Sequence, residues 1–242
     1  VRISTWSERN LGHLRQIRHG YAFKGKFFSN EGDFVLLTPG NFREEGGLKL
    51  KGDKEKYYTG DFPDEFLLRR GDLLVAMTDL TQHAPILGSP AFVPEDGRFL
   101  HNQRLGKVAN LRVDEIEPLF LFYLLNTAQV RGQIKASASG ATVRHTSPSR
   151  IYEVAVELPP IPVQRHIADI LSAYDELIEN SQRRIRILEA MARALYREWF
   201  VHFRFPGHEN HPRVPSPLGE IPEGWEVRHV KDVAVVTYGA PF

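Results

Sequence analysis

Apolar residues recur at alternating steps of four and three residues from Ile167 to Trp199. This spacing is typical of a helix whose apolar positions form the seam of a coiled coil. We therefore predict one helix over about residues 163–202, with a seam roughly 50 Å long at about 1.5 Å per residue. The seam positions are Ile167, Leu171, Tyr174, Ile178, Ser181, Ile185, Leu188, Ala192, Leu195 and Trp199.

A seam of this length needs a second helix beside it, because an isolated helix gains too little from its own hydrogen bonds to stay ordered. The alternative is that the seam packs onto the first domain of the same chain. We predict pairing with another helix. The residues expected to make this contact are Ile167, Leu171, Tyr174, Ile178, Ile185, Leu188, Leu195 and Trp199.

The sequence before this helix predicts an α/β domain over residues 1–158 with a small mixed sheet. Short runs of β-favouring residues are bounded by Gly, Pro or Asp, as expected for strands between tight turns. A longer apolar run over 119–136 predicts a helix with Pro118 in its first turn. The predicted strands are Val35–Leu37, Leu73–Met77, Gly106–Arg112 and Val154–Leu158.

Prolines mark both ends of the predicted helical segment, residues 159–205. Pro159 and Pro160 end the last strand, and Pro162 can open a helix, where its missing N–H would have no partner. The sequence Phe205-Pro206-Gly207 ends the helix. Residues 206–223 are rich in proline and are predicted to form a linker.

The two ends of the chain carry the same pattern. Trp6 aligns with Trp225, and the residues that follow each tryptophan keep the same spacing. The copies lie much further apart than the ~20–50 residues of a solenoid unit, so the repeat predicts a second domain. Residues 224–242 are then the first strand of a truncated second domain. The other aligned pairs are Leu11 and Val230, Leu14 and Val233, Ile17 and Val236, Gly20 and Gly239, and Phe23 and Phe242.

Composition changes this picture little. The chain is 42% hydrophobic and 25% charged, which is ordinary for a globular protein. It has no cysteine, which excludes disulfides and thiolate metal sites and suits a cytoplasmic location. The longest apolar run, residues 119–125, is far shorter than the ~20 residues that cross a bilayer, so no membrane association is expected.

The net charge is +1, but the acidic residues are unevenly distributed. None occurs within residues 9–30 or within residues 118–152, and both stretches contain several Arg or Lys residues. Basic surfaces of this kind can follow the phosphate backbone of a nucleic acid. The alternative is a solvated face that acidic residues elsewhere in the fold balance.

Motifs for catalysis are missing. The Asn/Asp-Pro-Pro-aromatic motif of amino methyltransferases has Leu158-Pro159-Pro160-Ile161 as its nearest match, which is wrong at both ends. No Gly-x-Gly-x-x-Gly or Walker loop occurs, and no lysine follows an acidic residue at the offset of the common nuclease core. His208 and His211 lie beside prolines, which excludes the helical zinc motif. We predict no catalytic residue, no metal site and no cofactor in this chain.

The segment from the prolines into the helix resembles the conserved region of specificity (S) subunits of type I restriction–modification systems. The similarity runs from Leu158 through Gln164-Arg165 to Ser172 and continues over Leu188–Phe200. Shorter matches extend it over nearly the whole chain. They are Gly20-Tyr21-Ala22-Phe23, Arg70-Gly71-Asp72-Leu73-Leu74, Asn102-Gln103-Arg104, Gly140-Ala141-Thr142-Val143-Arg144 and Leu218–Trp225.

The resemblance implies a non-catalytic subunit that recognises DNA. S subunits have two target-recognition domains, each binding one half of a split site in double-stranded DNA, and two antiparallel helices that set the spacing. The helices dock methyltransferase (M) subunits, which hold S-adenosylmethionine and methylate adenine, while a separate restriction and motor (R) subunit cuts DNA.

This sequence differs from the family pattern because it has one recognition domain, one helix and only the start of a second domain. We therefore predict a half-length S subunit, two copies of which pair as a homodimer and bind a palindromic split site. The alternative is a truncated adaptor that docks M subunits through its helix without binding DNA.

Recognition of bases and contact with phosphates require different side chains. Arg pairs with guanine and Gln with adenine through two hydrogen bonds, so we place Arg104, Arg144 and Gln82 at base edges. Weaker candidates in loop-like positions are Asn41, Arg43, Thr78 and His145. The phosphate candidates are Lys24, Lys26, Arg131, Lys135 and Arg150.

Some of these assignments have an alternative inside the fold. Arg104 is equally suited to a core ion pair with Asp72 or Asp79. Aromatic side chains beside the first basic stretch are expected to fill the core rather than to stack on bases. They are Tyr21, Phe23, Phe27 and Phe28.

Overall fold

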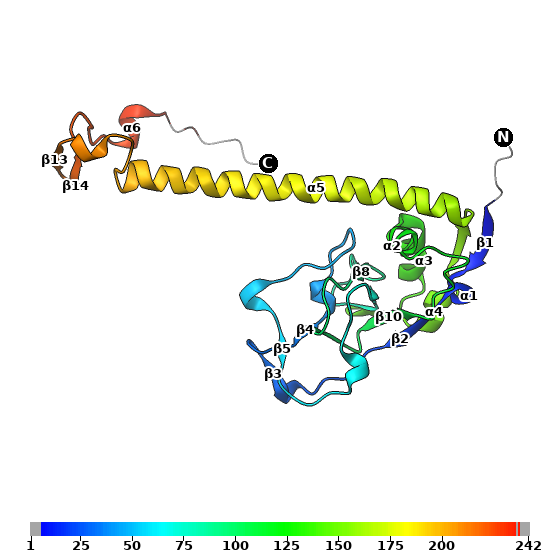
Figure 1. Ribbon diagram of the computed structural model, residues 1–242. Coiled ribbons are helices and arrows are strands. Elements are labelled where there is room, and N and C mark those ends of the chain that lie inside the picture. Colours follow the sequence, from blue (N-terminus) through cyan, green and yellow to red (C-terminus); the bar gives the residue numbers. More distant parts are fainter. Residues whose placement is uncertain (1–5, 236, 238–242) are drawn as a thin grey trace, which may run out of the picture. The chain divides into compact units, whose positions relative to one another are not determined.

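The computed structural model describes residues 6–235 and 237. The chain divides into two compact units, residues 1–172 and 173–242. Figure 1 shows the strands of the first unit and the long helix α5 (Ile161–Tyr196), which begins in it. The predicted mixed α/β domain followed by one long helix is confirmed. No helix among the described residues is both long and apolar enough to cross a membrane.

Two four-stranded sheets form the framework of the first unit. The first sheet is antiparallel, with the strand order β2–β10–β6–β8. The second has the order β3–β5–β4–β9, in which the pair β4–β9 is parallel. The strands of the first sheet are β2 (Gln16–His19), β6 (Leu73–Ala76), β8 (Pro90–Phe92) and β10 (Leu105–Ala109). Those of the second are β3 (Phe28–Ser29), β4 (Val35–Leu37), β5 (Tyr57–Tyr58) and β9 (Phe99–His101).

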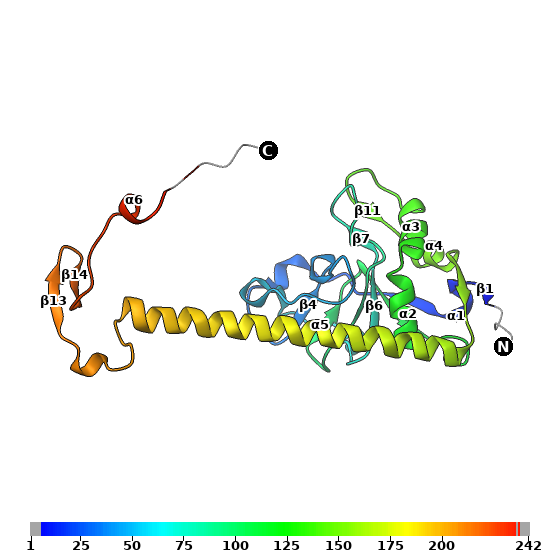
Figure 2. The same ribbon diagram turned by 90° about the horizontal axis from the view of Figure 1, so that it is seen from above.

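Two short strand pairs complete the first unit. β1 (Ser7–Asn10) pairs with β12 (Ala155–Leu158), which makes the first and last strands of the domain neighbours. β7 (Thr78–Asp79) pairs with β11 (Arg144–His145), and Figure 2 shows this pair projecting beside α3 (Ala128–Ala136). The short helices are α1 (Leu11–Leu14), α4 (Pro148–Tyr152), η1 (Gly25–Phe27), η2 (Pro39–Asn41), η3 (Gly52–Lys54) and η4 (Asp64–Phe66).

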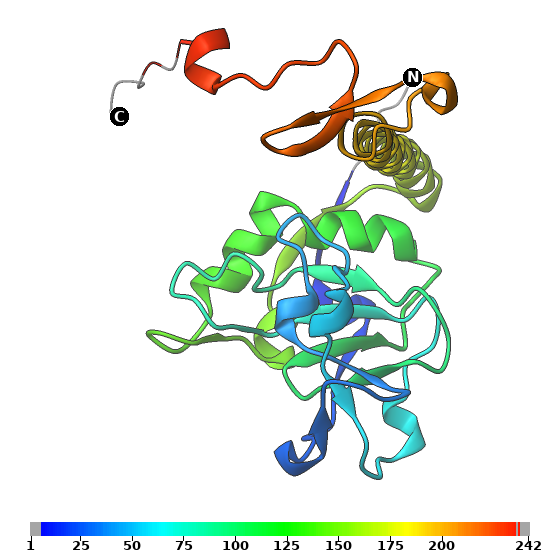
Figure 3. The same cartoon turned by 90° about the vertical axis from the view of Figure 1, so that its left-hand side faces the viewer.

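Three apolar clusters stabilise the first unit. The largest joins the first sheet to the helices, and Figure 3 shows the green helices α2 (Pro118–Leu125) and α3 lying along the sheet. A second cluster, around Phe42 and Phe99, lies between the two sheets. The third is aromatic, with the ring centroids of Phe23 and Tyr58 4.7 Å apart. Phe23 is therefore a core residue as predicted, whereas Phe28 is 38% exposed.

The apolar run over 119–136 folds as two helices instead of the single helix predicted. α2 (Pro118–Leu125) ends at Asn126, and α3 begins directly after Thr127. The Thr127 hydroxyl caps α3 by accepting a hydrogen bond from a backbone amide of its first turn (3.3 Å). A side-chain cap therefore interrupts a pattern that apolar periodicity alone would continue.

One buried glutamine fixes the start of α5 to the first unit. Gln164 accepts a hydrogen bond from the Glu117 amide (3.0 Å). It donates to the carbonyls of Glu115 (3.0 Å) and Pro159 (2.8 Å). Ala168, one turn later, is 1% exposed within the largest apolar cluster. Since each buried polar group left without a partner costs ~1–3 kcal/mol, these contacts hold the first turns of α5 firmly on the domain.

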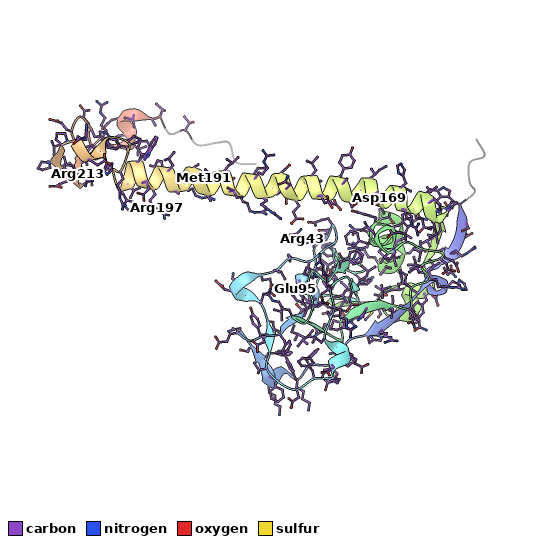
Figure 4. All side chains as sticks on the ribbon, viewed as in Figure 1. Arg43, Glu95, Asp169, Met191, Arg197 and Arg213 are labelled. Carbon is purple, nitrogen blue, oxygen red and sulfur yellow. The ribbon has the colours of Figure 1, made fainter. Side chains whose placement is uncertain are left out.

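Beyond Ser172 the seam of α5 is exposed. The exposed fraction is 53–63% for Tyr174, Ile178, Ile185 and Leu188. Figure 4 shows side chains standing out along the helix, with Asp169 near its start and Met191 near its end. The helix continues into a single π-helical turn, η5 (Arg197–Val201). Ile167, in contrast, packs against the largest apolar cluster of the first unit.

The segment predicted to be a linker contains a β-hairpin. β13 (Arg213–Ser216) pairs antiparallel with β14 (Gly219–Pro222), after the single turn η6 (His208–Asn210). A two-stranded hairpin tolerates its prolines, because each strand has one edge without ladder hydrogen bonds. Next to the hairpin, the indole of Trp225 packs against Phe200, with 5.8 Å between the ring centroids.

The described residues after Trp225 form a short helix rather than the predicted strand. This helix, α6 (Val230–Val233), lies at the same distance from Trp225 as α1 lies from Trp6. The repeat is therefore visible in the backbone at this turn. Residues 7–10 are extended because β1 pairs with β12, and within the described part of the chain residues 226–229 have no equivalent partner. The aligned Val236, Gly239 and Phe242 lie outside the described residues.

Candidate nucleic-acid interface

Four segments far apart in the sequence meet at one end of the first sheet. The Gln103 amide donates to the Tyr21 carbonyl (3.0 Å). The Met77 amide donates to the Arg104 carbonyl (3.0 Å), and the Thr146 amide donates to the Met77 carbonyl (2.9 Å). The backbone thus joins these loops into one surface, which we term the loop face. The loop face comprises residues 20–28, 78–86, 102–104 and 139–150.

Gly20 makes the closest approach in the loop face possible. A Cβ atom at this position would lie 2.3 Å from the Asn102 carbonyl oxygen. Because glycine has no such atom, residues 20–28 can lie directly on the turn at 102–104. The Asn102 side chain closes this turn by accepting a hydrogen bond from the Arg104 amide (2.9 Å).

Arg104 is exposed at the tip of this turn. Neither of the two ion pairs considered for it forms. Asp72 pairs with Lys107, with 2.7 Å between the carboxylate oxygen and Nζ. Asp79 is 2% exposed and accepts hydrogen bonds from the loop that follows it. The Arg104 guanidinium therefore remains open to a ligand.

Gln103 is exposed next to Arg104, although it was not among the predicted DNA contacts. An arginine and a glutamine side by side present the donor and acceptor groups that pair with guanine and adenine. The motif Asn102-Gln103-Arg104, one of the family matches, is the sequence signal that could have identified Gln103. In the folded chain, the turn leaves both side chains exposed.

The strand pair β7–β11 presents His145 at the surface. Its Nδ1 lies 3.0 Å from the hydroxyl of Thr78, which is 3% exposed. The hydroxyl orients the imidazole ring and leaves Nε2 for a ligand. Thr78 is therefore a positioning residue, and its prediction as a direct contact with DNA was wrong because the side chain is buried.

Gln82 is exposed on the loop that follows β7. The Asp79 carboxylate fixes this loop. It accepts from the amide and the hydroxyl of Thr81 and from the Ile86 amide, each at 2.8 Å. These donors satisfy a buried carboxylate and hold Gln82 on a short, ordered loop.

Arg144 and Arg150 both point back toward the protein. Arg144 donates to the Lys135 carbonyl (3.0 Å) at the end of α3. Arg150 donates to the Ser139 hydroxyl (2.8 Å) and to the His145 carbonyl (3.4 Å). These contacts stabilise the loop over 139–150. Arg144 thus braces the loop face, and its predicted contact with a base stays a prediction because the side chain is still partly exposed. The Lys135 side chain is half-buried beside it.

Two predicted DNA contacts are buried in the fold and were wrong. Asn41 is 1% exposed, accepts from the Thr38 amide (3.0 Å) and donates to Glu55 (2.9 Å). Arg131 is 7% exposed and donates to the Glu44 carbonyl (3.2 Å). Burial lowers the pKa of the Arg131 guanidinium, an effect that nearby acidic side chains partly offset. Both residues stabilise loops instead of facing a ligand.

The remaining basic candidates are exposed. Lys24 and Lys26 lie at η1 in the loop face, with the Lys26 ammonium 4.7 Å from the ring centroid of Phe27. Arg43, labelled in Figure 4, lies on the loop after η2, outside the four segments of the loop face. Of these three residues, Lys24 and Lys26 therefore contribute charge to the candidate interface.

Across the described ranges, no group of three or more His, Asp or Glu side chains is placed to hold a metal ion. The two histidines of the linker region each lie near a backbone carbonyl instead. His208 Nδ1 is 2.9 Å from the Phe205 oxygen, and His211 Nε2 is 3.0 Å from the Glu223 oxygen. The exposed side chains of the loop face offer hydrogen-bonding groups and positive charge, which can contact the bases and phosphates of a nucleic acid.

Residues 3–190 match the family model described as Type I restriction modification DNA specificity domain. The chain belongs to this family. The specificity subunit of the MjaIX enzyme from Methanocaldococcus jannaschii is 32% identical over 127 residues, which is 52% of this chain and 29% of the relative. That of EcoBI from Escherichia coli is 26% identical over 181 residues, 75% of this chain and 35% of the relative. That of HindI from Haemophilus influenzae is 28% identical over 210 residues, 83% of this chain and 42% of the relative.

The chain spans less than half the length of each of these relatives. Among solved structures, the type I S subunit from M. genitalium aligns with a TM-score of 0.59 at 20% identity. This alignment covers 83% of the present chain and 47% of the other, and at such identity it shows a shared fold. The resemblance inferred from the residues is confirmed at the level of the family.

Proposed function

We propose that this chain is the DNA sequence-recognition component of a type I restriction–modification system and catalyses no step itself. The observation that carries this proposal is the composition of the loop face. Positively charged and amide side chains gather there at one end of a rigid sheet, as phosphate contacts and base contacts require. The exposed residues concerned are Lys24, Lys26, Gln82, Gln103, Arg104 and His145.

We assign separate tasks to these side chains. Arg104 and Gln103 lie on one braced turn and are suited to paired hydrogen bonds with guanine and adenine in the major groove. His145 offers Nε2 from the adjoining strand pair, at an orientation that Thr78 fixes. Lys24 and Lys26 supply charge for phosphates, which strengthens binding to every sequence alike.

The proposal extends to assembly through α5. Two copies pair along the exposed seam as a homodimer, so that two identical loop faces bind the two halves of a palindromic split site. Burying half of the seam side chains at ~1.5–3 kcal/mol each is enough to drive such pairing. M subunits that hold S-adenosylmethionine and an R subunit that cuts DNA are the expected partners, in the cytoplasm.

Sequencing the methylated sites of cells that carry this chain with its M subunit tests both parts of the proposal. We expect one split motif whose two halves are identical and inverted. An asymmetric motif would contradict pairing of identical copies while leaving recognition intact.

Binding by the purified chain then separates recognition from a purely adaptor role. A duplex with the identified motif should bind at least ~10³-fold more tightly than a scrambled duplex, and both affinities should fall steeply with salt. A chain that binds M subunits but neither duplex would be the adaptor.

A further inference from the structure

We propose that an apolar groove on the first unit receives the aromatic end of α5 from a second copy of this chain. This inference rests on the pairing proposed above and adds a contact outside the seam. The groove is the surface by which the domain of one copy binds the helix of the other.

The groove lies beside the start of α5 and has a volume of about 390 Å³. Its walls come from α2, α3, β12 and the first turns of α5. Two of its large apolar side chains are open to water, since Trp6 is 52% exposed and Leu171 is 38% exposed. The apolar lining residues that matter here are Trp6, Phe120, Leu124, Val130, Ile167 and Leu171.

The groove and the seam are continuous. Ile167 and Leu171 are seam positions, and both also line the groove. Ala168, between them, faces the core of the first unit and is 1% exposed. A helix lying along the seam near Leu171 therefore has the groove directly at its side.

The charges of α5 favour an antiparallel partner of the same sequence. Residues 169–179 contain four acidic and no basic residues, whereas residues 183–197 contain five arginines and one glutamate. Antiparallel pairing sets the acidic segment of one copy opposite the basic segment of the other. Parallel pairing would set like charges together.

The spacing of the seam then determines which residues of the second copy lie at the groove. Full overlap of two identical antiparallel seams places Ile167 of one copy opposite Trp199 of the other, and Leu171 opposite Leu195. Tyr196 repeats the heptad position of Ala168, so it faces the same side, toward the domain of the first copy. Phe200, one turn later, stacks on Tyr196 with 5.1 Å between ring centroids.

The internal repeat supports this assignment independently. Within one chain, Trp225 packs against Phe200, which shows that the end of the helix binds a tryptophan at this position of the repeat. Trp6 is the repeat equivalent of Trp225 and stands at the groove. Phe200 is still 48% exposed, so it has surface left for Trp6 of the second copy.

The test measures the dissociation constant of the paired chain by sedimentation equilibrium. Trp6→Ala and Phe200→Ala should each weaken pairing roughly tenfold. The double variant should be little weaker than either single variant, because both remove the same contact. The controls Val113→Ala and Leu218→Ala remove exposed apolar side chains of each unit outside the groove and should change nothing.

A seam variant distinguishes this inference from the pairing on which it rests. In one outcome, the double variant Ile178→Asp with Leu188→Asp dissociates the pair, while Trp6→Ala and Phe200→Ala do not weaken it. Pairing then depends on the seam alone, and the groove proposal is overturned. If the seam variant stays paired, the pairing itself is wrong. If Trp6→Ala weakens binding of the M subunit and leaves the pair unchanged, the groove belongs to that partner instead.

Cross-linking gives a second readout that does not depend on affinity. The chain has no cysteine, so introduced cysteines report only the chosen contact. A chain with Gln129→Cys, mixed with a differently tagged chain with Phe200→Cys, should form a disulfide between copies. Asp53→Cys in place of Gln129→Cys should not, and equal cross-linking by both would contradict the proposal.

Discussion

The first unit and the helix beyond it place the same kinds of side chain in opposite environments. Leu74 and Leu105 are 0% exposed between the sheets, whereas Leu188 and Ile185 on α5 are 63% and 55% exposed. The first unit buries its apolar side chains with its own strands and helices. The apolar seam of the helix is as regular in spacing as the apolar face of a core element, but its side chains are exposed to water. This difference in exposure is the basis for the pairing proposed above.

The largest effect is expected from charging the seam. Ile178→Asp with Leu188→Asp should raise the dissociation constant of the pair at least ~10³-fold, since pairing would bury unpaired carboxylates at twofold-related positions. The unfolding of the first unit, followed by near-UV circular dichroism, should not change. Loss of the folded first unit in this variant would show that the two regions are not independent.

The next effect concerns the joint between the two regions. Gln164→Leu should lower the free energy of unfolding by about 2–4 kcal/mol, because it leaves the Glu117 amide and the carbonyls of Glu115 and Pro159 without this partner. Urea titration measures the change. Gln82→Leu, at an exposed position of the first unit outside the groove, is the matched control and should stay within ~0.5 kcal/mol of the wild type.

A smaller effect is expected for DNA binding by the loop face. The loop face belongs to the first unit and not to the exposed seam, so we expect its contacts with DNA to be independent of pairing. Arg104→Ala should weaken binding to the target duplex by ~10–100-fold and leave the weak binding to scrambled DNA nearly unchanged. Arg69→Ala, an exposed arginine outside the loop face, should change neither affinity by more than ~2-fold. Fluorescence anisotropy at fixed salt measures both. Equal loss for both duplexes would assign Arg104 to phosphates.

The smallest effect is a pH dependence of the free energy of unfolding, and it is confined to the first unit. His101 is 2% exposed, and its Nε2 lies 2.9 Å from the Leu105 carbonyl. Burial lowers the pKa of this imidazole to about 4. The unfolded chain takes up the proton near pH 6.5, so stability is complete above that pH and falls between pH 6.5 and 4.

The expected loss from His101 is roughly 1.5 kcal/mol at pH 5.5 relative to pH 8. His101→Gln should reduce this dependence, whereas His13→Gln, at an exposed position, should retain it. Urea unfolding at the two pH values gives the comparison. An equal slope in all three proteins would show that His101 does not carry the effect.

The sequence predicted the elements whose periodicity is strong. The helix was expected over 163–202, and α5 with η5 covers 161–201. Strands were expected at Val35–Leu37 and Leu73–Met77, where β4 and β6 lie. Family membership also followed from local motifs, because the segment from the prolines into the helix has a distinctive order of residues.

Features set by single polar side chains were not predictable from the sequence. Thr127 divides one apolar run into two helices by capping α3, although nothing in the apolar spacing marks the break. Asn41 and Arg131 are buried by hydrogen bonds to residues distant in the sequence. Arg104 was placed at a base edge from the sequence alone, whereas Gln103 was separable from ordinary polar residues only once Gly20 and the 102–104 turn were known to meet.

The pairing of β1 with β12 has a consequence for how such proteins diversify. Because the strands that open and close the domain are neighbours, its two ends are separated by little more than one strand spacing, ~4.8 Å. Everything between them can be exchanged as a cassette, since a replacement domain with the same two strands would meet the following helix at the same place. A single recombination event can therefore replace the domain and leave the helix that follows it unchanged.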